Sequence, residues 1–109
     1  MRVLLVPIAF LMLLGACASP VEAYCAAASE CGQRKNETEQ QCVANEQAKV
    51  DKVNARPECA TLVDAYEAML DCQGSLSCEE LSLETKASPC KAQIESYSGA
   101  LLNNLGCVF

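Results

Sequence analysis

Residues 59–72 read CATLVDAYEAMLDC and carry the clearest structural signal in the chain. The large apolar side chains of this stretch recur at the spacing of one helix face, and they are Leu62, Val63, Tyr66, Met69 and Leu70. Asp64 and Asp71 fall on the opposite face. This period predicts an amphipathic helix that packs its apolar face into a core. Pro57 suits the first position of that helix, and Gly74 suits its end.

The segment before this helix carries weaker signals. Asn36, with Glu39 three residues later, has the form of a capping box and predicts a helix over residues 36–55. Asn36-Glu37-Thr38 is also a glycosylation sequon, which matters only in a eukaryotic host. We expect residues 19–22 to form a short tether and residues 25–31, CAAASEC, a compact segment of about one helical turn.

Two helices are predicted after it. Ser77 and Glu80 form a second capping box and open a short helix that reaches about Thr85. Ser88-Pro89 opens the last helix, which we expect to end at Gly106. No alternating run of β-branched residues occurs in the sequence, so strands are not expected. The prediction is an all-α fold, a small antiparallel helical array in one domain over residues 25–109.

Cysteine supplies the stability that a core of this size lacks. Removal of residues 1–16 would leave 93 residues without a tryptophan, and such a chain buries only about 60–65% of its extended surface. The nine cysteines are Cys17, Cys25, Cys31, Cys42, Cys59, Cys72, Cys78, Cys90 and Cys107. If the first is modified or removed, eight remain, and we expect four disulfides, each contributing about 2–4 kcal/mol.

The spacing of these eight cysteines repeats. Residues 25–59 have the pattern C-x₅-C-x₁₀-C-x₁₆-C, and residues 72–107 have C-x₅-C-x₁₁-C-x₁₆-C. An internal duplication into two half-repeats is one interpretation. Chance spacing is the other, since the residues between the cysteines match poorly. A helical hairpin that turns near Arg56 would pair Cys42 with Cys72. Cys59 and Cys90 both lie near helix starts and could meet at the other end, so these are two guesses among 105 connectivities.

The N-terminus has the form of an export signal. Arg2 is the only charge in the first twenty-one residues, and residues 3–14 are an apolar run of twelve. Such a run spans about 18 Å as a helix, too short for a hydrocarbon core of roughly 30 Å. Residues 1–16 are therefore predicted to be a signal peptide, with a short tether over residues 17–24. Small-x-small patterns also permit cleavage before Ser19 or before Tyr24.

Leu14-Gly15-Ala16-Cys17 resembles the lipobox of bacterial lipoproteins, in which the signal is cut before a cysteine that carries a diacylglyceryl group. The resemblance implies acylation of Cys17 and attachment to a membrane. Ala18-Ser19 contains no aspartate, which in bacterial lipoprotein sorting is typical of an outer-membrane address. Together with the cysteine pattern and residues 65–72, AYEAMLDC, the chain resembles small cysteine-rich helical lipoproteins of bacteria such as the myxobacteria.

The composition argues against several classes of function. There is no histidine to act as a general base. The closest cysteines are spaced C-x₅-C, unlike the C-x₂₋₄-C pairs of zinc sites, so we expect no metal and no cofactor. Without Arg2 the chain has seven basic and fourteen acidic residues, which is opposite to a nucleic-acid-binding surface. We therefore do not expect an enzyme or a nucleic-acid partner.

Three hypotheses of function remain. The first is a membrane-tethered lipoprotein that binds an unknown protein partner or contributes to the cell envelope. The alternative is a small secreted carrier of an apolar small molecule or lipid, although the apolar stripes are barely enough to fill a core. The third is a secreted protease inhibitor, for which residues 32–35, GQRK, offer a weak reactive loop.

Overall fold

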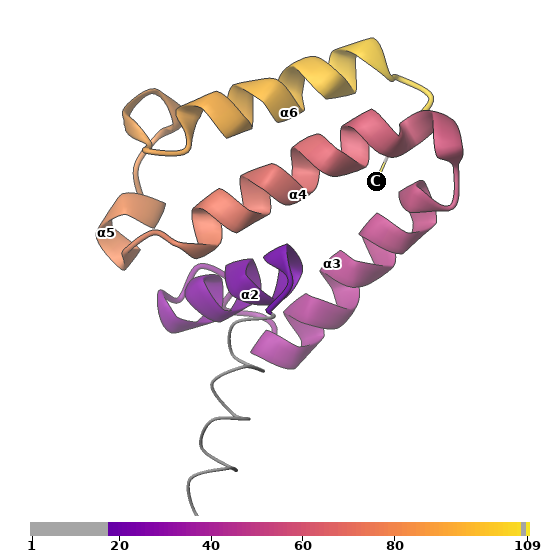
Figure 1. Ribbon diagram of the computed structural model, residues 1–109. Helices are drawn as coiled ribbons and strands as arrows, with labels where there is room; N and C mark the ends of the chain where they lie inside the picture. Colours follow the sequence, from indigo (N-terminus) through magenta and orange to yellow (C-terminus); the bar gives the residue numbers. More distant parts are fainter. Residues whose placement is uncertain (1–17, 108) are drawn as a thin grey trace, which may run out of the picture.

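The computed structural model describes residues 18–107 and residue 109 (Figure 1). Over this part of the chain the regular structure is helical and no strand occurs. The prediction of a small all-α fold is confirmed. The helices are α2 (Pro20–Glu30), α3 (Glu39–Asn54), α4 (Ala60–Gly74), α5 (Cys78–Leu81) and α6 (Lys91–Asn103), with 3-10 turns η2 (Pro57–Cys59) and η3 (Thr85–Ala87).

Helix α4 lies at the centre of the fold and packs against α2, α6 and α3. It buries Leu62, Val63, Tyr66 and Leu70, in agreement with the apolar spacing. Leu62 is 0% exposed and Leu70 is 2% exposed, and burial of one such side chain contributes about 1.5–3 kcal/mol. Helices α4 and α6 lie side by side and run in opposite directions (Figure 1). The other helices therefore assemble on α4.

Helix α2 begins within the predicted tether, residues 19–22, and that prediction is wrong; the helical turn predicted at residues 25–31 is part of the same, longer helix. Ser19 and Glu22 form a capping box, in which Ser19 Oγ accepts the Glu22 N–H at 3.2 Å and Glu22 Oε1 accepts the Ser19 N–H at 3.3 Å. Pro20 follows at the first helical position, which its fixed φ favours. Val21 is 1% exposed. Within the described residues, the first helix is therefore capped by Ser19 and contributes Val21 to the core.

Helix α3 begins later than predicted, because Thr38 rather than Asn36 is its N-cap. Thr38 Oγ1 accepts the Gln41 N–H at 3.1 Å, and Gln41 Oε1 accepts the Thr38 N–H at 2.8 Å. This reciprocal pair satisfies two backbone donors at the helix start. Asn36 lies in the preceding turn. The helix ends at Asn54, close to the predicted end.

Between α4 and α6 the sequence predicts one short helix that reaches about Thr85, whereas the structure has two short elements, α5 and η3. Ser77 caps α5 as predicted, but α5 ends at Leu81. Neither α5 nor η3 buries a side chain, so no apolar stripe holds a longer helix in place. The last helix begins at Lys91, because the Ser88 hydroxyl accepts the Cys90 N–H at 3.0 Å in the turn before it.

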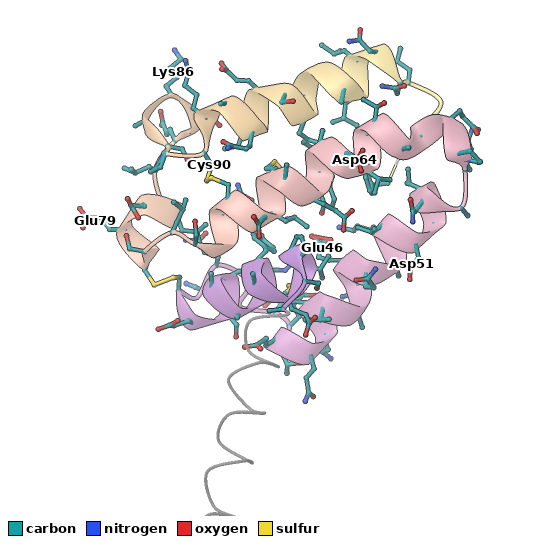
Figure 2. All side chains as sticks on the ribbon, in the orientation of Figure 1. Glu46, Asp51, Asp64, Glu79, Lys86 and Cys90 are labelled. Carbon is teal, nitrogen blue, oxygen red and sulfur yellow. A yellow bond between two sulfur atoms is a disulfide. The ribbon has the colours of Figure 1, made fainter. Side chains whose placement is uncertain are left out.

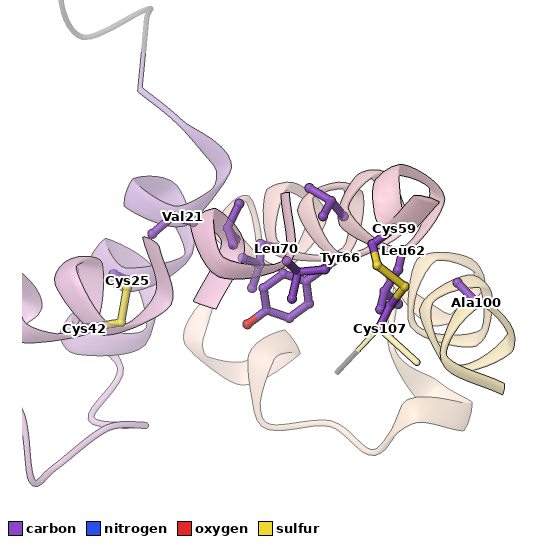
Figure 3. Packing of buried hydrophobic residues seen from close by; sticks show 12 residues of the cluster. Val21, Cys25, Cys42, Cys59, Leu62, Tyr66, Leu70, Ala100 and Cys107 are labelled. Atoms are coloured by element: carbon purple, nitrogen blue, oxygen red, sulfur yellow. A yellow bond between two sulfur atoms is a disulfide. The ribbon is translucent and has the colours of Figure 1, made fainter. Parts of the chain in front are cut away.

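The buried hydrophobic residues form one cluster between the helices (Figure 3). Its members are Val21, Cys25, Cys42, Val50, Val53, Cys59, Leu62, Val63, Tyr66, Leu70, Ala100 and Cys107. The Tyr66 ring lies 4.4 Å from the Phe109 ring and 5.1 Å from the Tyr97 ring, measured between centroids. Three aromatic rings and two complete disulfides thus fill a core that contains few large aliphatic side chains.

Candidate functional site: the disulfide framework and its cleft

Four disulfides pair the eight cysteines that follow Cys17, and the one at Cys90 can be seen in Figure 2. They are Cys25–Cys42, Cys31–Cys78, Cys59–Cys107 and Cys72–Cys90. Their Cα–Cα distances run from 5.1 to 5.8 Å, within the usual range for disulfides. Among the described residues, no three histidine, cysteine, aspartate or glutamate side chains form a group that could hold a metal ion.

The two predicted pairs, Cys42 with Cys72 and Cys59 with Cys90, are wrong. They assumed a hairpin in which α3 and α4 lie against each other along their length. Helix α4 instead makes its main contacts with α2 and α6. Cys42 therefore meets Cys25 on α2, and Cys72 meets Cys90 just before α6.

The pairing follows the predicted repeat. In each half the first cysteine bonds the third, Cys25 with Cys42 and Cys72 with Cys90, at sequence separations of 17 and 18. The other two bridges join equivalent positions of the two halves, at separations of 47 and 48. Helices α2 and α3 thus correspond to α4 and α6. These pairings are consistent with the interpretation of an internal duplication, in which the fold is two linked copies of a two-helix unit.

The four bridges differ in their access to solvent. Cys25, Cys59 and Cys90 are 0% exposed, so each of three bridges has at least one fully buried partner. In the fourth, Cys78 is exposed and Cys31 is partly exposed. Cys31 ends α2 and Cys78 begins α5. Cys72, bonded to the buried Cys90, is also partly exposed, so Cys31–Cys78 is distinguished as the bridge that has an exposed cysteine and no buried one.

A cleft of about 500 Å³ lies beside the exposed bridge, between α2 and the end of α4. Its lining residues are Ala23, Ala26, Ala27, Glu30, Cys31, Gly74, Leu76, Ser77 and Cys78. Most of the lining side chains are small, and Glu30 is the charged group among them. The volume falls in the range of about 300–1,000 Å³ that small-molecule sites occupy.

Glu46 is a buried charge that the sequence analysis missed. It is 3% exposed on α3 (Figure 2). Its Oε1 accepts the Tyr66 hydroxyl at 2.9 Å, and its Oε2 lies 3.0 Å from the Lys49 ammonium without a hydrogen bond of good geometry. The detectable signal was spacing, since Glu46 falls on the same helix face as the buried residues Cys42 and Val50.

The buried carboxylate shifts the titration of its neighbours. Burial raises the pKa of the Tyr66 phenol, and the charge of Glu46 raises it further. The pKa of Tyr97 is raised by the same two causes. Because the carboxylate is paired, its desolvation is compensated by ions from α3 and from the preceding loop. The hydrogen bond between Tyr66 and Glu46 therefore fastens α3 to α4.

Arg34 connects the loop before α3 to this cluster. Its guanidinium pairs with Glu37, reaches Glu46 Oε1 at 3.4 Å and lies 6.0 Å from the Tyr24 ring centroid. The hydrogen bond to Glu37 raises the pKa of Arg34 and lowers that of the Glu37 carboxyl. A reactive loop of a protease inhibitor needs a free, exposed side chain. The Arg34 side chain is instead held in ion pairs with Glu37 and Glu46, which argues against a protease-inhibitor loop at residues 32–35.

Comparison of the chain with models of protein families, with curated proteins and with solved structures finds no match in any of the three. The fold and its bridges define a small, all-α, disulfide-rich protein. Within residues 18–107 and residue 109, no helix has the length and apolar character needed to cross a bilayer. The predicted signal peptide and the predicted lipidation site, Cys17, lie outside the described residues.

Proposed function

We propose that the chain is an exported bacterial lipoprotein, cut before Cys17 and held at the outer membrane by acyl chains on that cysteine. The tethered helical domain serves as a non-enzymatic module that binds a protein partner or contributes to the envelope. The observation that carries this proposal is the position of the lipobox, which ends two residues before the Ser19 N-cap.

The start of α2 supports cleavage before Cys17 over cleavage before Tyr24. Cleavage before Tyr24 would discard the Ser19 cap and Val21, which is 1% exposed in the core. Loss of a buried valine and of a capping box costs about 2–4 kcal/mol. A cut before Cys17 keeps every residue that the structure describes and leaves Ala18 alone between the acylated cysteine and the cap. Such a short connection would hold the domain against the membrane surface.

The disulfides support export. Cytosolic thiols are kept reduced, whereas the periplasm and the cell exterior allow disulfides to form and persist. Four bridges in a small domain match the usual solution for a chain whose core is marginal. Because these bridges engage eight cysteines, their thiols do not offer a nucleophile while the protein is oxidised. This supports a binding or structural role over covalent catalysis.

Metabolic labelling tests the proposal. The full chain is expressed in a Gram-negative host supplied with an alkyne-tagged fatty acid, and the purified protein is scored for label. We expect label on the parent chain and none on Cys17→Ser. The double variant Cys31→Ser/Cys78→Ser is the matched control, since it also loses sulfur but should keep the label. Equal label on the parent and on Cys17→Ser, or none on either, would contradict the proposal.

The cleft beside Cys31–Cys78 favours one second candidate, a carrier of a small apolar molecule. Its volume of about 500 Å³ suits such a ligand, and its wall of alanines is apolar. Native mass spectrometry of protein recovered from lipid extracts tests the carrier. Bound lipid at a fixed stoichiometry supports it, and ligand-free protein from every extract argues against it.

A further inference from the structure

The segment between α4 and α6 is held to the rest of the molecule in an unusual way. Residues 75–89 contain α5 and η3, and none of their side chains is buried. Cys78 is bonded to Cys31 of the first half, and Cys90 is bonded to Cys72 just beyond the segment. Apolar packing therefore contributes little to the position of residues 75–89. The bond between Cys31 and Cys78 is the covalent link between this segment and α2.

Exposure is greatest at this bridge, since each of the other three contains a cysteine that is 0% exposed and the most exposed of their cysteines, Cys72, is only partly exposed. Thiol–disulfide exchange requires a thiolate to approach a sulfur directly, so its rate depends on exposure. Cys78 is exposed, and the cleft beside it is lined by both sulfur-bearing residues, Cys31 and Cys78. Cys59 and Cys107, by contrast, are 0% and 5% exposed within the core.

We propose that Cys31–Cys78 is a thiol–disulfide exchange site, a redox latch that fastens residues 75–89 to α2. This role is independent of the acylation of Cys17. The remaining three bridges lie in or beside the core and preserve the helix packing when the latch opens. Opening therefore releases the 75–89 segment and leaves the rest of the fold in place.

The reaction at the latch proceeds in two exchanges. A thiolate, RS⁻, attacks Cys78 Sγ, which forms a mixed disulfide between R and Cys78 and expels the Cys31 thiolate. A second RS⁻ attacks the R sulfur of that mixed disulfide, which forms RSSR and expels the Cys78 thiolate. The two cysteines gain two electrons, two molecules of thiol lose them, and water protonates the thiolates according to their pKa. We assign the first attack to Cys78 because it is the more exposed partner.

The charges at the site select the class of thiol. Glu30 lines the cleft, Glu79 follows Cys78 in the chain, and no lysine or arginine occurs among the described lining residues. An anionic thiolate that carries a further negative group is repelled by such a surface. We therefore assign the site to thiols with a neutral or positively charged body.

Timed reduction of the native protein tests the site. The oxidised protein is treated with cysteamine, which is cationic, or with thioglycolate, which is anionic, at equal thiolate concentration. Thiols that open are trapped by alkylation and located by peptide mapping. We expect Cys31 and Cys78 to be labelled at least about ten times faster than the other six cysteines. Relative to the rates of the two reagents with a small uncharged disulfide, cysteamine should be the faster reagent at this bridge, with an advantage that shrinks in high salt. Simultaneous labelling of all eight, or faster labelling of a buried pair, would overturn the assignment.

A pair of double variants tests the latch without a reductant. Cys31→Ser/Cys78→Ser should keep the helical circular dichroism of the parent and show faster amide exchange confined to residues 75–89. Cys25→Ser/Cys42→Ser removes a core bridge and should speed exchange in α2 and α3 as well. The idea of a local latch fails if both double variants lose helix content equally, or if exchange over residues 75–89 does not change in the first.

Discussion

Gly74 at the end of α4 lies directly against the backbone of Ala23 in α2. A Cβ placed on Gly74 would be 2.7 Å from the Ala23 carbonyl carbon and 2.9 Å from the Tyr24 amide nitrogen. These are backbone atoms, so relief requires the two helices to move apart. Glycine at position 74 is therefore a packing requirement where α4 meets α2, and Gly74 and Ala23 both line the cleft.

The substitution Gly74→Ala should destabilise the fold by about 1–3 kcal/mol, the usual cost of overpacking. Gly99→Ala is the matched control, because a Cβ on Gly99 of α6 meets no atom within 4 Å. It should stabilise α6 by about 0.5–1 kcal/mol through helix propensity. Urea unfolding of the three proteins measures both effects. Equal stability changes of the same sign would show that α2 and α4 do not approach as closely as described.

The bond between Tyr66 and Glu46 should be measurable on its own. Tyr66→Phe keeps the ring in the aromatic cluster and removes the 2.9 Å hydrogen bond to the carboxylate. We expect a loss of about 1.5–3 kcal/mol, the range for hydrogen bonds to charged groups. Tyr97→Phe, a change at the neighbouring ring, should cost less. A larger loss of stability in Tyr97→Phe than in Tyr66→Phe would contradict the assignment of the main polar contact of the core to Glu46.

Alkaline pH should destabilise the protein through the same phenol. Burial and the Glu46 charge raise the pKa of Tyr66 above its ordinary value of 10.0. Because the folded-state pKa is the higher one, the contribution is fully present below about pH 10 and is lost as pH rises through the folded pKa. Unfolding free energies measured across this range should fall less steeply for Tyr66→Phe. Identical alkaline slopes for the parent and the variant would contradict the prediction.

Acidic pH should destabilise the protein in part by protonating the Glu37 carboxylate. The hydrogen bond from Arg34 is the main cause that lowers the pKa of the Glu37 carboxyl below 4.5, followed by the bond from Asn45. A lowered folded-state pKa gives a stabilisation that is present above pH 4.5 and is lost as pH falls through the folded value. Thermal unfolding between neutral pH and about pH 3 should therefore show a smaller pH dependence for Glu37→Gln than for the parent. A larger dependence in the variant would refute this account of the ion pair.

The central helix could be predicted because its apolar residues repeat with the helical period over three turns. The capping box at Ser77 could also be predicted, because Ser77 and Glu80 have the required spacing. Helix α2 was missed because its buried face is made of alanine, valine and cysteine, which give no strong apolar stripe. Its Ser19 and Glu22 carry the same capping signal, and that signal was overlooked because the segment follows the predicted export signal.

The disulfide pairs could not be derived in the same way. Cysteine spacing predicts the repeat, but the partner of each cysteine depends on how the helices cross. Cys42 meets α2 instead of α4 because α3 and α4 do not pack against each other along their length. No local sequence pattern encodes that arrangement of the helices. The burial of Glu46 and the exposure of Cys78 are likewise results of helix packing.

The intact mass of the mature protein from a bacterial host tests the proposed function most directly. In the measurement made without reduction, we expect a chain that begins at Cys17 and carries acyl mass. Its other eight cysteines should accept an alkylating reagent only after reduction. A chain that begins at Tyr24 and carries no acyl mass would contradict the proposed function, because that product lacks Val21 of the core and lacks Cys17, the predicted lipidation site.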